Sequence, residues 1–119
     1  MLININSQED VITLFCSAAS RHAEATELGN YLSCNKAYDQ IIWALRRLEM
    51  HDAVDQLSRL LNSPDVGVQL WTATFLLFHT HPDAENTLAT LAAQQSLIGF
   101  SAGVTLTEWR AGRLRPLTA

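Results

Sequence analysis

The sequence has few cysteines and no long apolar run. Its 119 residues include two cysteines, Cys16 and Cys34, whereas a disulfide-stapled secreted domain usually carries more. The first ten residues, MLININSQED, contain neither a basic nor an apolar signal region, so we expect no signal peptide. No stretch approaches the ~18 apolar residues that a transmembrane helix needs, and polar residues interrupt residues 66–78. We therefore expect a reducing, cytoplasmic location and no membrane span.

Basic residues are also scarce. The chain has 8 Lys and Arg against 12 Asp and Glu, a net charge of −4, and Lys36 is its single lysine. Proteins that bind nucleic acids neutralise phosphates with Lys and Arg, so this balance disfavours a nucleic acid as partner. A mildly acidic surface instead suits solubility or a basic protein partner.

The hydrophobic content predicts one folded domain. Hydrophobic residues make up 48% of the chain and charged residues 17%, outside the range typical of disordered chains. A chain of this length matches one domain and can bury one core. We expect a single domain over residues 1–119, in which the alternation of Ile3 and Ile5 with Asn is compatible with an extended arm over residues 1–6.

Apolar residues recur with the helical period of 3.6 over nearly the whole chain. No segment beyond the first few residues alternates with the period of a strand. We therefore predict an all-α fold of about six helices, separated by breaks at residues 29–30, 51–52, 62–65, 81–83 and 99–103 and ending at Gly112. The expected N-caps are Ser7 for the first helix, Ser33 for the second, and Ser63, followed by Pro64, for the fourth.

Similar residues recur 34 to 36 positions apart. Leu57 and Leu91 are separated by 34 residues, and Leu70 and Leu106 by 36. Self-similarity at such periods is typical of arrays in which each repeat is a pair of helices. A plain helical bundle with coincidental spacings is the alternative interpretation.

Several segments carry a resemblance to a known family. They are LLNSPDVGVQLW at residues 60–71, NKAYD at 35–39, WTA at 71–73, and GFSA at 99–102 followed by EWR at 108–110. The first resembles the inter-helix turn and second helix of a HEAT-like repeat, and together, over roughly residues 10–115, they resemble an uncharacterised bacterial family of small HEAT-like helical proteins. The resemblance implies an α-α superhelix and protein binding, and it implies no catalytic residue. An Arg commonly follows the Val of such a turn, whereas here Gln69 follows Val68, which removes one expected ion pair between helices.

Residues 99–103, GFSAG, match the G-x-S-x-G pattern of a hydrolase nucleophile elbow. That elbow needs a strand before the Ser and a His after it. Residues 92–95 are helical in character, and the last histidine, His81, precedes Ser101. We interpret the motif as a turn and the start of a helix.

The remaining chemistry-bearing residues form no recognisable site. His79 and His81 make an H-x-H pair without a supporting Cys or His cluster, and we expect them at a helix end and in the turn that follows it. Glu24 and Glu27 share a helix face, a spacing that usually marks a solvated surface. The sequence therefore predicts no catalytic residue, no metal site and no cofactor.

The three tryptophans are expected to differ in role. Trp71 and Trp109 are predicted to pack between helices. Trp43 falls off the apolar stripe of its helix, close to Arg47, and an exposed aromatic beside Arg is typical of an interface anchor. We favour packing in the core or in a second layer for Trp43, and an interface anchor is the alternative. His22, on the apolar side of the first helix, is expected to be a hydrogen-bonded residue at the edge of the core.

These observations lead to one hypothesis of function. The chain is predicted to be a non-enzymatic protein-binding module, and specifically a bacterial immunity protein that binds and neutralises a toxin. It is small, acidic and without recognisable catalytic residues, and toxins that attack nucleic acids are often basic, so an acidic surface would steer their association. The candidate partner-binding residues are Asp39, Trp43, Asp52 and Asp55.

Two alternatives remain open. A nucleic-acid-associated HEAT-like module would use the arginines of the C-terminal segment, Arg110, Arg113 and Arg115. A structural adaptor or homodimer would instead pair through the surface around Trp43.

Overall fold

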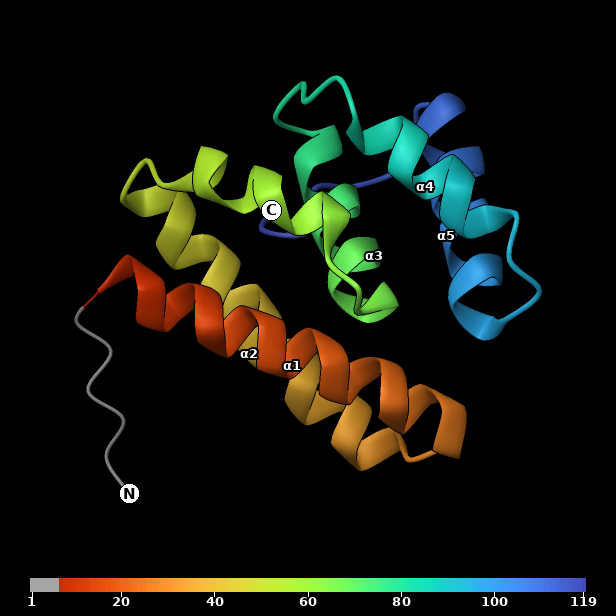
Figure 1. The fold of residues 1–119 in the computed structure, drawn as a ribbon, viewed down its shortest axis with the longest axis horizontal. Coiled ribbons are helices and arrows are strands. Elements are labelled where there is room, and N and C mark those ends of the chain that lie inside the picture. Colours follow the sequence, from red (N-terminus) through yellow and green to blue (C-terminus); the bar gives the residue numbers. More distant parts are fainter. Residues whose placement is uncertain (1–6) are drawn as a thin grey trace.

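The protein is all-α, as the helical periodicity predicts. The structure, a computed structural model, describes residues 7–119, so the arm expected over residues 1–6 lies outside the described residues. Between residues 7 and 119 there is no strand. The elements, in chain order, are α1 (Gln8–Leu28), α2 (Tyr31–Met50), the 3₁₀ helix η1 (Val54–Asn62), α3 (Val66–Leu77), α4 (Ala84–Ala92) and α5 (Leu97–Arg110) (Figure 1).

The first helix begins and ends where its capping residues predict. The Ser7 side chain accepts a hydrogen bond from the Asp10 backbone N–H, which satisfies one of the free donors at the helix start. At the other end Gly29 adopts a left-handed conformation with φ of 68°, which favours glycine, and the chain turns directly into α2. The two helices form the most extensive helix–helix contact of the molecule.

Two predicted helix starts are wrong by two or three residues. Helix α2 begins after Asn30, whose side chain accepts from the backbone N–H of Ser33, so Ser33 lies inside the helix. Helix α3 is capped by Asp65, whose carboxylate accepts from two backbone N–H groups, and not by Ser63. In both cases two residues capable of capping lie close together, and the sequence does not show which of them the backbone places at the helix start.

Two further predictions about local structure need correction. The third helix is a 3₁₀ helix with no side-chain N-cap. The expected interruption at residues 99–103 does not exist, because α5 runs through both glycines after Ser96 caps it. At Gly99 an added Cβ would clash with the carbonyl oxygen of Gln94, so the close approach of the preceding turn requires glycine there.

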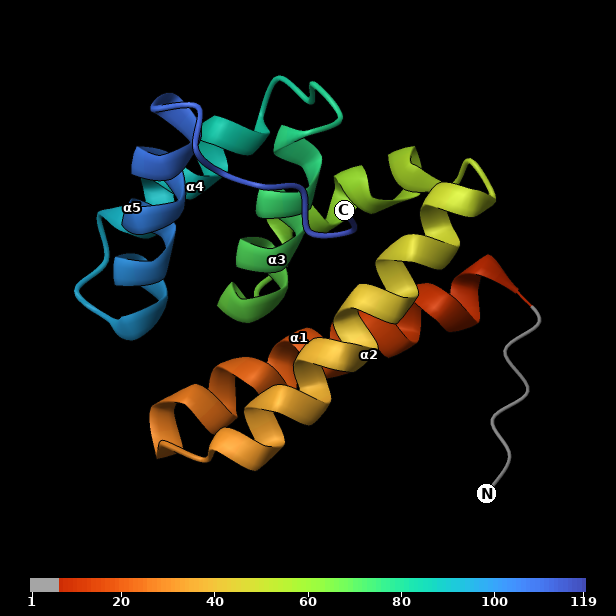
Figure 2. The same cartoon turned by 180° about the vertical axis from the view of Figure 1, so that it is seen from behind.

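Helix α3 lies at the centre of the fold. Nine of its 12 residues are buried, and it packs against η1, α1, α4 and α5. The segment after α5 returns along α3, where Leu114 and Leu117 pack against the core (Figure 2). Helix α2 packs mainly on α1, so it lies at the edge of the molecule. These contacts do not establish the stacking of helix pairs into a HEAT-like superhelix, which stays a prediction.

The crossing of α1 and α3 depends on Gly67. A Cβ added at this position would lie 2.8 Å from the carbonyl oxygen of Ala19 and 2.8 Å from the Cβ of Ala23. Both atoms belong to α1, and one of them is backbone, so the neighbouring helix cannot yield by a simple side-chain rotation. The small residue therefore sets the separation of the two helices.

We predict that Gly67→Ala lowers the free energy of unfolding by about 1–3 kcal/mol, because the added methyl overpacks this crossing. The matched control is Gly103→Ala on α5, where the nearest heavy atom outside the helix backbone, the Cβ of Ala92, is 3.9 Å from the added carbon. There the higher helix propensity of Ala should leave stability unchanged or raise it. Urea unfolding followed by circular dichroism measures both, and equal effects at the two sites would contradict the crossing argument.

One buried hydroxyl in α3 lacks a partner. Thr72 is fully buried, and its Oγ1 makes no hydrogen bond to any residue between 7 and 119. Thr74, one half-turn away, donates its hydroxyl to the carbonyl oxygen of Leu70 at 2.8 Å. Leaving a buried polar group unsatisfied costs free energy that an apolar group of the same shape does not.

We therefore expect the isosteric change Thr72→Val to raise the free energy of unfolding by about 1 kcal/mol. Thr74→Val removes a hydrogen bond from the same helix and should be neutral or destabilising by about 1 kcal/mol. Thermal and urea unfolding of the two variants provide the comparison. A loss of stability in Thr72→Val would show that its hydroxyl is satisfied in solution.

Candidate protein-binding surface

The outward face of α2 carries the best candidate site. Its inward residues, which include Ile41, Leu45 and Leu48, are buried. On the opposite side five residues recur at helical spacing and are exposed, and we call them the α2 stripe: Leu32, Asp39, Trp43, Arg46 and Met50. At 1.5 Å per residue the stripe is about 27 Å long. It combines three large apolar side chains with one charge of each sign.

Trp43 is the anchor of this stripe. Its side chain is 42% exposed, and the guanidinium of Arg47 lies over the indole with its Cζ 5.3 Å from the ring centroid. This cation–π contact holds both side chains against the helix surface. The Nε of Arg47 is buried and has no hydrogen-bond partner among residues 7–119. The structure therefore has an exposed tryptophan beside an arginine, the alternative interpretation of Trp43, in place of the packed residue that the sequence favoured.

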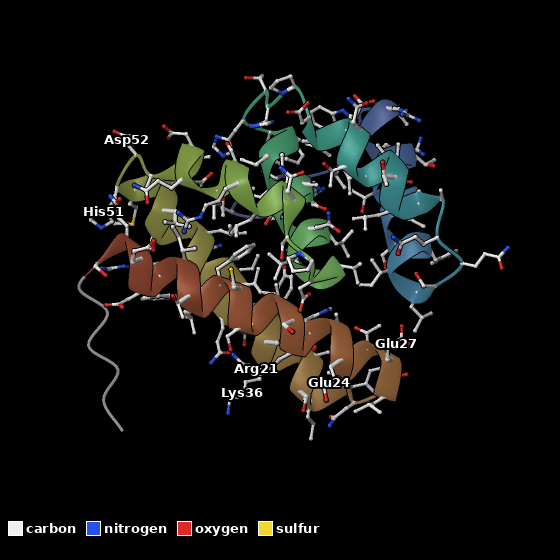
Figure 3. All side chains as sticks on the ribbon, in the orientation of Figure 1. Arg21, Glu24, Glu27, Lys36, His51 and Asp52 are labelled. Atoms are coloured by element: carbon white, nitrogen blue, oxygen red, sulfur yellow. The ribbon has the colours of Figure 1, made fainter. Side chains whose placement is uncertain are left out.

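The four predicted binding residues fall into two groups. Asp39 and Trp43 are one turn apart on α2. Asp52 lies in the turn after α2 with φ of 53°, and Asp55 in the first turn of η1. Both carboxylates are exposed and make no side-chain hydrogen bond or ion pair within the described part of the chain, and Figure 3 shows Asp52 beside His51 at one end of the molecule.

Sequence reasoning noted Arg46 and Arg47 on this helix as a possible basic edge but did not place positive charges beside the predicted binding residues. Lys36 and Arg46 are exposed on the same side of α2 as Asp39. The signal was available, because positions 36, 39, 43 and 46 share one face of a helix. The α2 stripe is thus mixed in charge, and the acidic part of the surface is the end that carries Asp52 and Asp55.

The other predicted polar residues have structural partners. His79 Nε2 lies 3.1 Å from a carboxylate oxygen of Glu49, which ties the end of α3 to α2. His81 Nδ1 accepts a hydrogen bond from the Asp83 backbone N–H, which places it in the turn, as predicted. No group of three or more His, Cys, Asp or Glu side chains in residues 7–119 is arranged to hold a metal ion.

The G-x-S-x-G motif and the cysteines show no catalytic geometry. Ser101 lies inside α5 and follows no strand, so the strained turn of a nucleophile elbow is missing. Cys16 and Cys34 are free and half-buried. Burial raises the pKa of the Cys16 thiol, which disfavours the reactive thiolate. None of the described helices is long and apolar enough to span a membrane.

Carboxylates pair with two of the three C-terminal arginines. The guanidinium of Arg110 donates to Glu85 at 3.2 Å, and that of Arg113 donates to both oxygens of Glu108 at 2.8 and 3.1 Å. This bidentate contact lowers the pKa of the Glu108 carboxyl. The pairs offset much of the positive charge that a phosphate backbone would require.

Two of the tryptophans pack between helices, as predicted. The ring of Trp71 on α3 meets His22 on α1 edge-on, with centroids 5.1 Å apart, and it also contacts Tyr38 on α2. Trp109 packs against Phe78 in the same way. His22 is half-buried at the core edge, and burial lowers its pKa from the usual 6.5.

We predict that the His22 ring titrates with a midpoint below 6.5, because burial disfavours its charged form. The unfolded chain then binds the proton more readily, so stability is complete above pH 6.5 and falls as the pH drops through that value. NMR titration of the ring protons measures the midpoint. His22→Gln should flatten the loss of stability between pH 7 and pH 5, and a midpoint at or above 6.5 would contradict the burial argument.

The comparisons with known proteins add no relative: no family model, curated protein or solved structure matches the chain. The fold and surface define a small all-α protein with an outward stripe of apolar and charged side chains around a tryptophan held by an arginine. Such a surface resembles the anchor and rim of a protein–protein interface.

Proposed function

We propose that the chain is a non-enzymatic, HEAT-like module that binds another protein through the α2 stripe. One observation carries the proposal: Trp43 is exposed, stacked by Arg47, and lies on a helix face that no other described helix covers. Tryptophan and arginine are the residues most enriched among those that dominate binding energy.

The stripe has the composition of an interface. Leu32 is 83% exposed and Met50 75% exposed, and their burial by a partner would remove apolar surface from water. Asp39 and Arg46 lie between them, so a partner needs complementary charges in register with its apolar contacts. This combination favours a protein partner over a small molecule.

The more specific proposal is a cytoplasmic bacterial immunity protein that neutralises a basic toxin. Asp52 and Asp55 provide two carboxylates beyond the end of the stripe that make no ion pair with any residue from 7 to 119, and the chain carries a net charge of −4. An acidic partner surface speeds the approach of a basic protein and can cover its active site. The nucleic-acid alternative has less support, because Arg110 and Arg113 already pair with carboxylates.

The experiment first identifies the partner and then maps its contact. Immobilised wild-type chain captures proteins from a lysate of the source organism, and mass spectrometry identifies any stoichiometric partner. If the partner is a toxin, its expression in a bacterial host should arrest growth, and co-expression of this chain should restore it. A partner that is harmless to the host would contradict the immunity proposal and leave protein binding in place.

With the purified partner at nanomolar concentrations, we predict that Trp43→Ala raises the dissociation constant at least about 30-fold, because it removes the anchor. Asp52→Lys with Asp55→Lys should slow association with a basic partner about tenfold at low salt and less at high salt. Surface plasmon resonance measures both effects.

The matched control is Glu24→Lys with Glu27→Lys, the same charge change at the same spacing on α1. Equal slowing by the two pairs would show that only net charge matters. An unchanged affinity in Trp43→Ala would remove the α2 stripe from the interface.

A further inference from the structure

Helix α5 carries a second uncovered apolar face. Ile98, Ala102 and Leu106 bury one side of the helix against the core. On another side Leu97, Phe100 and Val104 recur at helical spacing and are exposed, and Phe100 is 72% exposed. We call these three residues the α5 face.

A groove runs beside the α5 face. It has a volume of about 600 Å³ and lies between the end of α4 and the length of α5, and its lining includes Ala92, Gly99, Gly103 and Thr107 as well as Phe100. The two glycines contribute no side chains to fill it. One helix therefore presents a projecting aromatic ring directly beside a recess.

A protrusion next to a recess on the same helix is self-complementary. In a two-fold interface each copy offers the same patch, so the ring of one copy can enter the groove of the other, and the reverse contact forms at the same time. A second copy therefore occupies both features with a surface that the chain already has.

The charges at the two ends of α5 select the orientation of a second copy. Glu24 and Glu27 on α1 line a groove together with Ile98, the second residue of α5, and neither makes an ion pair within residues 7–119 (Figure 3). At the other end of α5, Arg110 and Arg113 keep 61% of their side-chain surface exposed. Glu85 and Glu108 pair with these two arginines, and Arg115 leaves this end with one more arginine than carboxylates. Antiparallel packing of two α5 helices brings the acidic end of each copy to the basic end of the other.

We propose that the occupant of the α5 face is a second copy of this chain, docked with its α5 antiparallel and with Phe100 of each copy in the groove beside Gly103 of the other. Helix α5 has 14 residues and is about 21 Å long. The area that two copies of the α5 face alone would bury falls short of the ~1,200 Å² of total area that stable interfaces usually bury. The dimer is therefore weak, with a dissociation constant on the order of 10–100 µM at low salt.

Sedimentation equilibrium of the full chain between about 5 and 500 µM tests this directly. The weight-average mass should rise from 13.2 kDa toward twice that value, and less so at high salt, since the ends of the helices pair by charge. A mass that stays at 13.2 kDa at the highest concentration and low salt overturns the proposal.

Variants locate the interface. Phe100→Ser should raise the dimer dissociation constant at least about tenfold, and Glu24→Arg with Glu27→Arg should raise it severalfold at low salt. Leu32→Ser and Trp43→Ala, which remove exposed apolar groups from the α2 stripe, should leave it unchanged. Because Phe100 is exposed, Phe100→Ser should fold normally, and circular dichroism checks that it does. Dimerisation that survives Phe100→Ser, or that is lost in Trp43→Ala, overturns the proposal without bearing on the capture of a different protein by α2.

Discussion

The burial of α3 is the constraint on which the rest of the structure depends. Nine of its 12 residues are buried, so the helix needs neighbours on nearly every side. Helices α1, η1, α4 and α5 and the segment with Leu114 and Leu117 supply them. Gly67 makes the close approach of α3 to α1 possible, because any side chain there would meet the backbone of α1. The positions of the other elements follow from the need to cover the apolar surface of α3.

This arrangement leaves the surrounding helices with faces that no other described element covers. Helix α2 buries its inner side mainly on α1 and has no further layer of the described chain outside it. Helix α5 packs on α4 and α3 and is likewise open on one side. The two candidate surfaces thus follow from the way in which a small domain encloses a central helix.

The helices were predictable from the sequence because their apolar residues repeat with a period that only a helix satisfies. The ends at Ser7 and Gly29 were predictable as well, since Ser7 is followed three residues later by Asp10 and glycine is the usual residue just after a helix. The cap at Asp65 was not, because Ser63 and Pro64 form an equally good start two residues earlier. A side chain at position 99 would clash with the turn at Gln94, so the glycine there serves this close approach and does not break α5. No local sequence pattern encodes that contact.

The two candidate surfaces differed in how far the sequence could reveal them. Trp43 lies off the apolar stripe of α2 and one turn from Arg47, so helical geometry indicated exposure as one of its two possible roles. Leu97, Phe100 and Val104 have the same spacing as a face that packs into a core, and α5 has two such faces. Periodicity identifies apolar faces but does not say which of them the fold covers. That choice depends on how many neighbours α3 requires, and α5 reaches α3 with only one of its two apolar sides.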